Sequence, residues 1–100
     1  MSRRIKTPTV GEILKDEFMD PLNVSAYKLA NGVHVPVSRI QDILHGRRKI
    51  TVDTSLRLAK FFGVSDDYFL KIQNDIDLRN TKMNLKKEIE SIVTLERYDR

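Results

Sequence analysis

The chain contains no cysteine, no tryptophan and only two histidines, His34 and His45, among its 100 residues. The absence of cysteine excludes disulfide bonds and thiolate metal ligands. Two histidines are too few for a metal site unless carboxylates join them, so we expect neither a metal nor another cofactor. A chain without cysteine also fits a reducing compartment, and we expect the protein to be cytoplasmic.

Long apolar runs are missing as well. No stretch of about 18 apolar residues is present, and Ser2–Lys6 is polar and basic where a secretory signal is apolar, so we expect no membrane contact. The sequence has no internal repeat and no alternating strand pattern, and its 40% hydrophobic residues predict one all-α domain. It also lacks a Gly-rich phosphate loop and a paired nucleophile and base, which argues against an enzyme.

The net charge of +4 is unevenly distributed along the chain. Residues 1–8 carry +3 and residues 34–60 carry +4, whereas residues 9–33 and 61–80 each carry −2. Such clustering of basic charge is typical of a surface that binds a polyanion. We expect residues 1–8 to form a flexible basic arm, which either lies along DNA or only solubilises the chain.

Residues 26–49 predict a helix-turn-helix, and the functional interpretation depends on them. Two short apolar faces are separated by Asn31–His34, which breaks the helical period, so the two helices must cross. Ala30 is small enough to lie at the crossing. Pro36 suits the first turn of the second helix, and Gly46 suits its end. The faces comprise Tyr27, Leu29 and Ala30, then Val35, Ile40, Ile43 and Leu44.

The second helix of this motif has an exposed polar side and is followed by a run of cations. This arrangement predicts a base-reading face with phosphate contacts at its end. The alternatives are a plain helical hairpin and, for Arg39, a surface ion pair with Asp42 or Asp53. The candidate base-reading residues are Val37, Ser38, Arg39, Gln41 and Asp42. The candidate phosphate contacts are Ser25, Lys28, Arg47, Arg48 and Lys49.

Helical periodicity and capping residues predict the remaining elements. The first helix runs from Val10 to Phe18 or Met19, with Thr9 as its N-cap. Ser25 or Asn23 caps the second, and the third runs from Pro36 to His45. Thr51 or Asp53 caps a fourth helix, whose apolar face comprises Leu56, Leu58, Ala59, Phe61 and Phe62 and which ends at Gly63. Ser65 caps a fifth, with an inner stripe of Tyr68, Phe69, Ile72 and Ile76, and the helical signal weakens over Asn80–Asn84.

A final helix is predicted after this weak stretch, and its apolar stripe follows i, i+4, i+7, i+8 spacing. The stripe comprises Leu85, Ile89, Ile92 and Val93. It either covers Tyr68, Phe69 and Ile72 within one monomer, pairs with its copy in a homodimer, or binds another protein. The expected organisation is an arm at 1–8, a helix-turn-helix domain at 9–80 and a C-terminal helix at 81–100.

The run from Leu29 to Arg79 resembles the HigA (VapI) family of antitoxins within the repressor-like helix-turn-helix superfamily. The specific motifs are VPVSRIQDILHGRRKIT, DTSLRLAKFFG and LKIQNDIDLR. One departure is His34, which stands where many repressors place glycine; because histidine tolerates the left-handed region comparatively well, we expect the turn to form.

The resemblance implies a five-helix repressor-like fold, here with an additional C-terminal helix. It further implies the antitoxin of a type II toxin-antitoxin module that binds a palindromic double-stranded operator as a homodimer and represses its own operon. The implied protein partner is a HigB-type toxin, a ribosome-dependent mRNA endonuclease. The alternatives are a stand-alone transcriptional regulator, which shares the helix-turn-helix but has no toxin partner, and a helical adaptor without DNA affinity.

Overall fold

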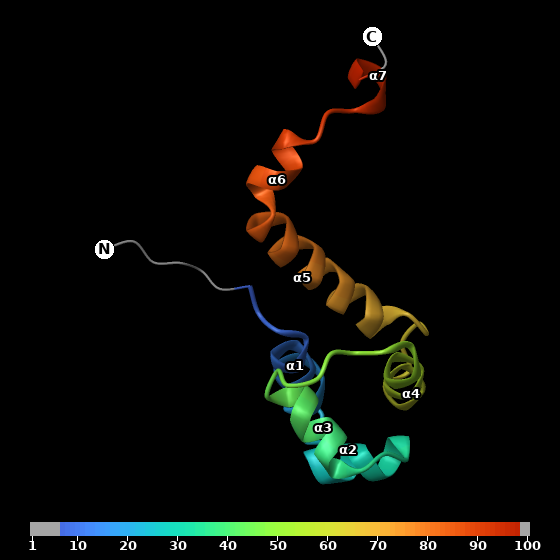
Figure 1. The fold of residues 1–100 in the computed structure, drawn as a ribbon. Coiled ribbons are helices and arrows are strands. Elements are labelled where there is room, and N and C mark those ends of the chain that lie inside the picture. Colours follow the sequence, from blue (N-terminus) through green and yellow to red (C-terminus); the bar gives the residue numbers. More distant parts are fainter. Residues whose placement is uncertain (1–6, 99–100) are drawn as a thin grey trace, which may run out of the picture.

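The computed structural model describes residues 7–98, which contain helices and no strand (Figure 1). The predicted all-α class is confirmed, while most of the predicted basic arm lies outside the described residues. Within residues 7–98, no helix combines the length and apolar character needed to cross a membrane. The elements are α1 (Val10–Ile13), η1 (Leu14–Met19), α2 (Ala26–Val33), α3 (Val37–Leu44), α4 (Val52–Phe62), α5 (Tyr68–Asn84), α6 (Lys86–Ser91) and α7 (Leu95–Tyr98).

The first predicted helix is present but changes its winding. The Thr9 side chain accepts a hydrogen bond from the backbone N–H of Glu12 at 3.1 Å, which confirms the predicted N-cap. After Ile13 the helix continues as the π-helical segment η1, and the N–H of Asp20 donates to the carbonyl of Lys15 at 2.9 Å. Together α1 and η1 span the predicted Val10 to Met19.

The core lies between the first helix (α1 with η1) and helices α2, α3, α4 and α5. Its completely buried large side chains are Leu14, Leu29, Ile40, Ile43, Leu58 and Phe69. Burial of one such side chain contributes about 1.5–3 kcal/mol. Phe18 packs edge-on against Phe69, with ring centroids 5.0 Å apart, and it also contacts Phe62. Three positions predicted to face the core are instead exposed: Tyr27 is 68% exposed, Leu56 45% and Tyr68 38%.

Close approach of α1 to α3 fixes the orientation of the second helix of the motif. A Cβ atom on Gly11 would lie 2.2 Å from the backbone oxygen of Ile43, so only glycine allows this contact. Ala30 in α2 is 2% exposed, and its place at the crossing of α2 with α3 stays a prediction. His34 ends α2 in the left-handed conformation, with φ 62° and ψ 48°, which confirms that the turn tolerates histidine there.

The chain after Gly63 departs from the predicted elements. Ser65 is not the N-cap of α5, because the helix begins after Asp67, and no side chain caps it. The helix then continues through Asn84, although the helical pattern of the sequence weakens over Asn80–Asn84. Residues 78–84 are exposed and contribute nothing to the core, so the apolar pattern did not reveal this part of the helix.

The predicted final helix is divided into α6 and α7. Ile92 adopts an extended conformation, with φ −77° and ψ 123°, so Ile92 and Val93 no longer share a helical face with Leu85 and Ile89. These four side chains are 43–70% exposed. Figure 1 shows α6 and α7 beyond the end of α5, away from α1–α4. The alternative in which the stripe covers Tyr68, Phe69 and Ile72 within one monomer is therefore wrong.

Candidate nucleic-acid interface

The start of α2 is capped by one of the predicted phosphate contacts. The Ser25 hydroxyl accepts a hydrogen bond from the backbone N–H of Lys28 at 3.0 Å, which confirms Ser25 rather than Asn23 as the cap. The first turn of a helix leaves N–H groups without intrahelical partners and carries a partial positive charge. Ser25 and the Lys28 side chain are both exposed, so this end of α2 has the properties needed to approach a phosphate.

Helix α3 has one buried side and one open side. Ile40 and Ile43 are completely buried, whereas Val37 and Ser38 are exposed and Arg39, Gln41 and Asp42 are half-buried. The five candidate base-reading residues therefore lie away from the core. The helix begins at Val37, with Pro36 as the extended residue before it, one position later than predicted. The N-terminal half of α3 is thus free to approach a groove.

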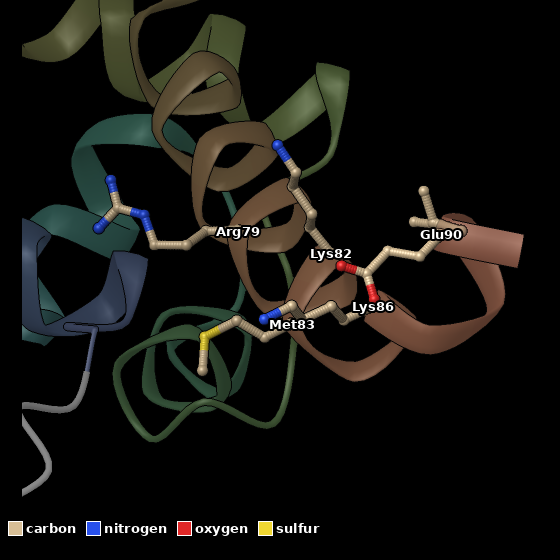
Figure 2. A pocket seen from close by; sticks show the side chains of 6 residues that line it. Arg79, Lys82, Met83, Lys86 and Glu90 are labelled. Atoms are coloured by element: carbon tan, nitrogen blue, oxygen red, sulfur yellow. The ribbon is translucent and has the colours of Figure 1, made fainter.

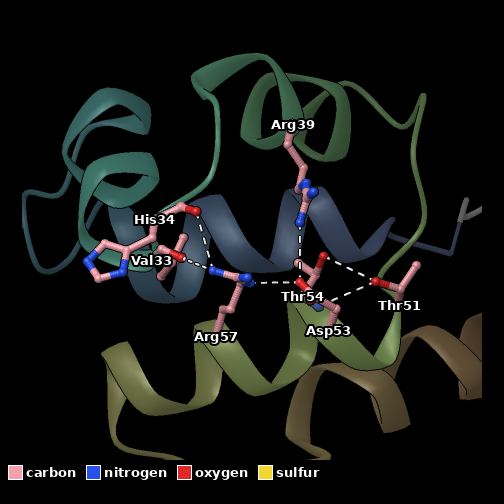
Figure 3. A network of polar contacts seen from close by, with 7 residues as sticks. All are labelled: Val33, His34, Arg39, Thr51, Asp53, Thr54 and Arg57. Atoms are coloured by element: carbon pink, nitrogen blue, oxygen red, sulfur yellow. Dashed lines mark hydrogen bonds and ion pairs between the residues drawn. The ribbon is translucent and has the colours of Figure 1, made fainter.

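Arg39 takes part in a polar network that connects α3 with α4 (Figure 3). Its Nη1 donates to Oδ1 of Asp53 at 3.2 Å, and Nε of Arg57 donates to the same oxygen at 2.7 Å. Arg57 Nη1 also donates to the backbone oxygens of Val33 and His34, at 2.8 and 3.3 Å. The surface ion pair that was the alternative role for Arg39 is therefore present.

The same network favours the ionised form of Asp53. The hydrogen bond from Arg57, followed by the charges of Arg57 and Arg39, lowers the pKa of this carboxyl below its usual value. Asp53 was predicted as a possible N-cap, but that role belongs to Thr51, whose hydroxyl accepts from the N–H of Thr54 at 3.3 Å. Asp53 had been named as a possible partner of Arg39, but Arg57 was missed, although an acid and a cation four residues apart on a helix are a recognisable pair.

The basic loop, residues 46–50, is held against the end of α3. Gly46 has φ 74°, and the N–H groups of Arg47 and Arg48 both donate to the backbone oxygen of Asp42, at 2.7 and 3.2 Å. The Arg47 side chain pairs with the Asp42 carboxylate at 3.0 Å and remains 60% exposed. Among residues 7–98, Arg48 has no ion-pair partner. These cations are accessible to a polyanion.

Helix α5 supports the far end of the same loop through a residue that sequence reasoning missed. Gln73 is 6% exposed, and its Oε1 accepts from the N–H of Ile50 at 3.1 Å. Its Nε2 donates to Asp77 at 3.1 Å, and Asp77 pairs with Lys49 at 3.2 Å. The sequence did contain a signal for Gln73, because it lies on the same helix face as Phe69, Ile72 and Ile76. A polar side chain on a buried face needs a hydrogen-bond partner.

A second open surface lies where α5 meets α6, on the segment predicted to contact a partner. Met83 and Ile89 line an apolar groove there, and Figure 2 shows the charged side chains of Arg79, Lys82, Lys86 and Glu90 around it. Leu85, Ile92 and Val93 are exposed on the same segment. The groove is separate from the face that carries Arg39.

Comparison with known sequences identifies the same motif. A helix-turn-helix family model matches residues 16–69, which include α2, α3 and α4. "Virulence-associated protein I" of Dichelobacter nodosus is 40% identical over 85% of this chain and 78% of its own length. The uncharacterized HTH-type transcriptional regulator YbaQ of Escherichia coli is 32% identical, over 93% and 84%. Antitoxin HigA-1 of Vibrio cholerae is 28% identical, over 87% and 82%.

Solved structures extend the similarity to nearly the whole fold. The HigA-family addiction module antidote protein of Coxiella burnetii is 39% identical, with a TM-score of 0.81 over 90% of this chain and 98% of that one. Pseudomonas aeruginosa antitoxin HigA with the higBA promoter has a TM-score of 0.83 at 28% identity, over 90% and 99%. Antitoxin GraA in complex with its operator has a TM-score of 0.82 at 28% identity, over 95% and 97%. This chain therefore belongs to the helix-turn-helix family of DNA-binding transcription regulators and resembles its HigA and VapI antitoxins.

Proposed function

We propose that this protein is the antitoxin of a type II toxin-antitoxin module. It binds its operator as a dimer, represses its own operon and neutralises a HigB-type mRNA endonuclease. The observation that carries the proposal is the open face of α3 followed directly by the exposed basic loop, in a chain similar to antitoxins solved with operator DNA. Binding to the operator and to the toxin is sufficient for this function, and no catalytic activity is needed.

Base reading is assigned to Arg39, Ser38 and Gln41, with Val37 and Asp42 at the edge of the contact. A guanidinium carries five N–H donors, and the bond to Asp53 uses only one on Nη1. Arg39 therefore retains enough donors for a bidentate contact with O6 and N7 of a guanine, worth about 1–3 kcal/mol of discrimination.

Phosphate binding is assigned to the two ends of the motif. Ser25 and Lys28 lie at the start of α2, and the exposed loop after α3 supplies Arg47, Arg48 and Lys49. Contacts of this kind set affinity and salt dependence but carry no sequence information. The ion pairs of Arg47 and Lys49 are exposed and contribute little stability, so a phosphate can replace the carboxylates at small cost.

The test of base reading compares Arg39→Ala with the unmodified chain on two DNA duplexes. One duplex carries the promoter region of the protein's own gene, and the other is a scrambled sequence of equal length and composition. We expect the ratio of the two dissociation constants to fall about 5- to 150-fold. Lys71→Ala removes one cation from α5 and serves as the control. An unchanged ratio for Arg39→Ala would show that this residue does not read bases.

The toxin partner is tested in the native host. Affinity purification of the tagged chain should retain a small basic ribonuclease encoded by the neighbouring gene, and expression of that ribonuclease alone should stop growth. The second candidate function is a stand-alone regulator, favoured by the similarity to the HTH-type transcriptional regulator YbaQ. Operator binding without a co-purifying, growth-arresting neighbour supports that alternative.

A further inference from the structure

We propose that Asp53 is a specificity-determining positioning residue, which holds the Arg39 guanidinium for base reading and withholds it from indiscriminate phosphate contacts. The inference rests on the proposed function, since it requires Arg39 to contact bases. It assigns to α4 a part in sequence discrimination that acts through Arg39, although no α4 residue is among the candidate DNA contacts.

Arg57 holds the carboxylate of Asp53 in place. Asp53 Oδ1 accepts from Arg57 Nε at 2.7 Å, and Arg57 is tethered to the backbone oxygens of Val33 and His34. Arg57, in the middle of α4, thereby ties this helix to the end of α2, where Val33 lies 24 residues earlier in the chain. The acceptor of Arg39 is thus an exposed carboxylate held by Arg57, which is itself bonded to the backbone at the end of α2 (Figure 3).

The bond to Asp53 restricts the conformations of the Arg39 side chain. The Arg39 side chain is 30% exposed and the Asp53 side chain 58%, and the 3.2 Å bond between them holds one end of the guanidinium. A flexible arginine must lose several rotamers when it binds a base edge. Asp53 already restricts the Arg39 side chain before DNA binds, which removes part of this entropy cost. The gain applies when the N–H donors of Arg39 that are not bonded to Asp53 face the groove. Binding to a correctly placed guanine is favoured accordingly.

Asp53 also affects binding to DNA that lacks the operator sequence. The charge of Asp53 repels DNA phosphates and competes with them for Arg39, so a complex that uses Arg39 only as a cation is penalised. Asp53 is ionised near neutral pH, as an ordinary aspartate is, and the Arg57 hydrogen bond lowers its pKa further. The preorganisation of Arg39 and the competition of Asp53 with phosphates act in the same direction, because each raises the ratio of operator affinity to non-specific affinity.

The experiment is a double-mutant cycle that uses the full chain, its own promoter duplex and the scrambled duplex at one fixed salt concentration. The variants are Asp53→Ala, Arg39→Ala and the double substitution. We expect Asp53→Ala to lower the affinity ratio about tenfold, partly through tighter binding to scrambled DNA. In the Arg39→Ala background the same substitution should change the ratio by less than about twofold, because there is no guanidinium left to position.

The matched control is Asp67→Ala. Asp67 pairs with Lys71 at i,i+4 spacing, as Asp53 does with Arg57, but it precedes α5 and has no bond to α3. Circular dichroism melting of every variant separates DNA effects from unfolding. If Asp53→Ala is poorly folded, Asp53→Asn replaces it, since the amide keeps an oxygen acceptor and removes the charge; its affinity for scrambled DNA should then increase.

Three results would separate the possibilities. An unchanged ratio for Asp53→Ala or Asp53→Asn, while Arg39→Ala lowers it, would overturn the positioning role and leave base reading intact. An equal fall in both backgrounds would also overturn it, because Asp53 would then act without Arg39. An unchanged ratio for Arg39→Ala would instead refute the proposed base reading, and the positioning role with it.

Discussion

Gln73 and Ile50 lie 23 residues apart in the chain, yet the Gln73 side-chain oxygen accepts a 3.1 Å hydrogen bond from the backbone N–H of Ile50. The bond is buried and fixes the end of the basic loop to α5. The helix that leads to the C-terminal segment therefore also supports a loop that we assign to phosphate binding.

Replacement of Gln73 by leucine is expected to destabilise the fold. The buried N–H of Ile50 would be left without its acceptor, and an unsatisfied buried donor costs about 1–3 kcal/mol. Urea denaturation measures the change in the free energy of unfolding. Asn74→Leu, at the adjacent exposed position, is the control and should change it by less than about 0.5 kcal/mol. Equal effects of the two substitutions would mean that the bond to Ile50 contributes nothing measurable.

The left-handed backbone at His34 leads to a second prediction. With φ 62° the residue carries a conformational cost of about 1–2 kcal/mol that glycine avoids, although glycine loses about 0.5–1 kcal/mol through its greater freedom when unfolded. We therefore expect His34→Gly to raise the free energy of unfolding by up to about 1 kcal/mol, and His34→Val to lower it. Thermal denaturation of both variants measures the effects.

His45 provides a matched control for that prediction. It is the other histidine at a helix end, but its φ is −93°, so glycine relieves no strain there. Its ring also bonds the backbone oxygen of Gln41 at 2.7 Å. His45→Gly should destabilise the protein, and stabilisation by both substitutions would indicate an effect unrelated to the backbone conformation.

Removal of the two arginines after Gly46 tests the phosphate contacts. The Arg47→Ala/Arg48→Ala variant should bind the promoter and scrambled duplexes more weakly by a similar factor, because phosphate contacts are independent of sequence. A plot of log affinity against log salt should flatten by up to about one unit for each arginine that no longer binds a phosphate. Lys71→Ala/Lys87→Ala removes the same charge from α5 and α6 as the control. An altered base preference with an unchanged slope would contradict the assignment.

The exposed C-terminal segment should mediate dimerisation. One short reading helix contacts too few base pairs, and two copies about 34 Å apart satisfy two half-sites. Residues 85–98 contribute nothing to the monomer core, so a chain ending at Asn84 should remain folded. Sedimentation should show a dimer for the full chain and a monomer for the shortened one. A shortened chain that stays dimeric would free Leu85, Ile89, Ile92 and Val93 for binding the toxin.

Local signals were sufficient for the helix-turn-helix. The caps Thr9 and Ser25, the break at His34 and the alternation of buried Ile40 and Ile43 with open positions all follow from residues within one or two helical turns. Such features depend on backbone hydrogen bonding and periodicity. The sequence alone therefore determined the class of fold and the position of the candidate reading helix.

Contacts between distant residues were decided only by the tertiary structure. Tyr27 faces solvent although it lies next to the buried stretch of α2, and Gln73 is buried because Ile50 needs an acceptor. Asp53 bonds Arg39 because Arg57 holds α4 against the end of α2. Periodicity shows which residues share a helix face, but it does not show which face meets a neighbour. That depends on how all the helices pack at once, since each buried polar group must find its partner there.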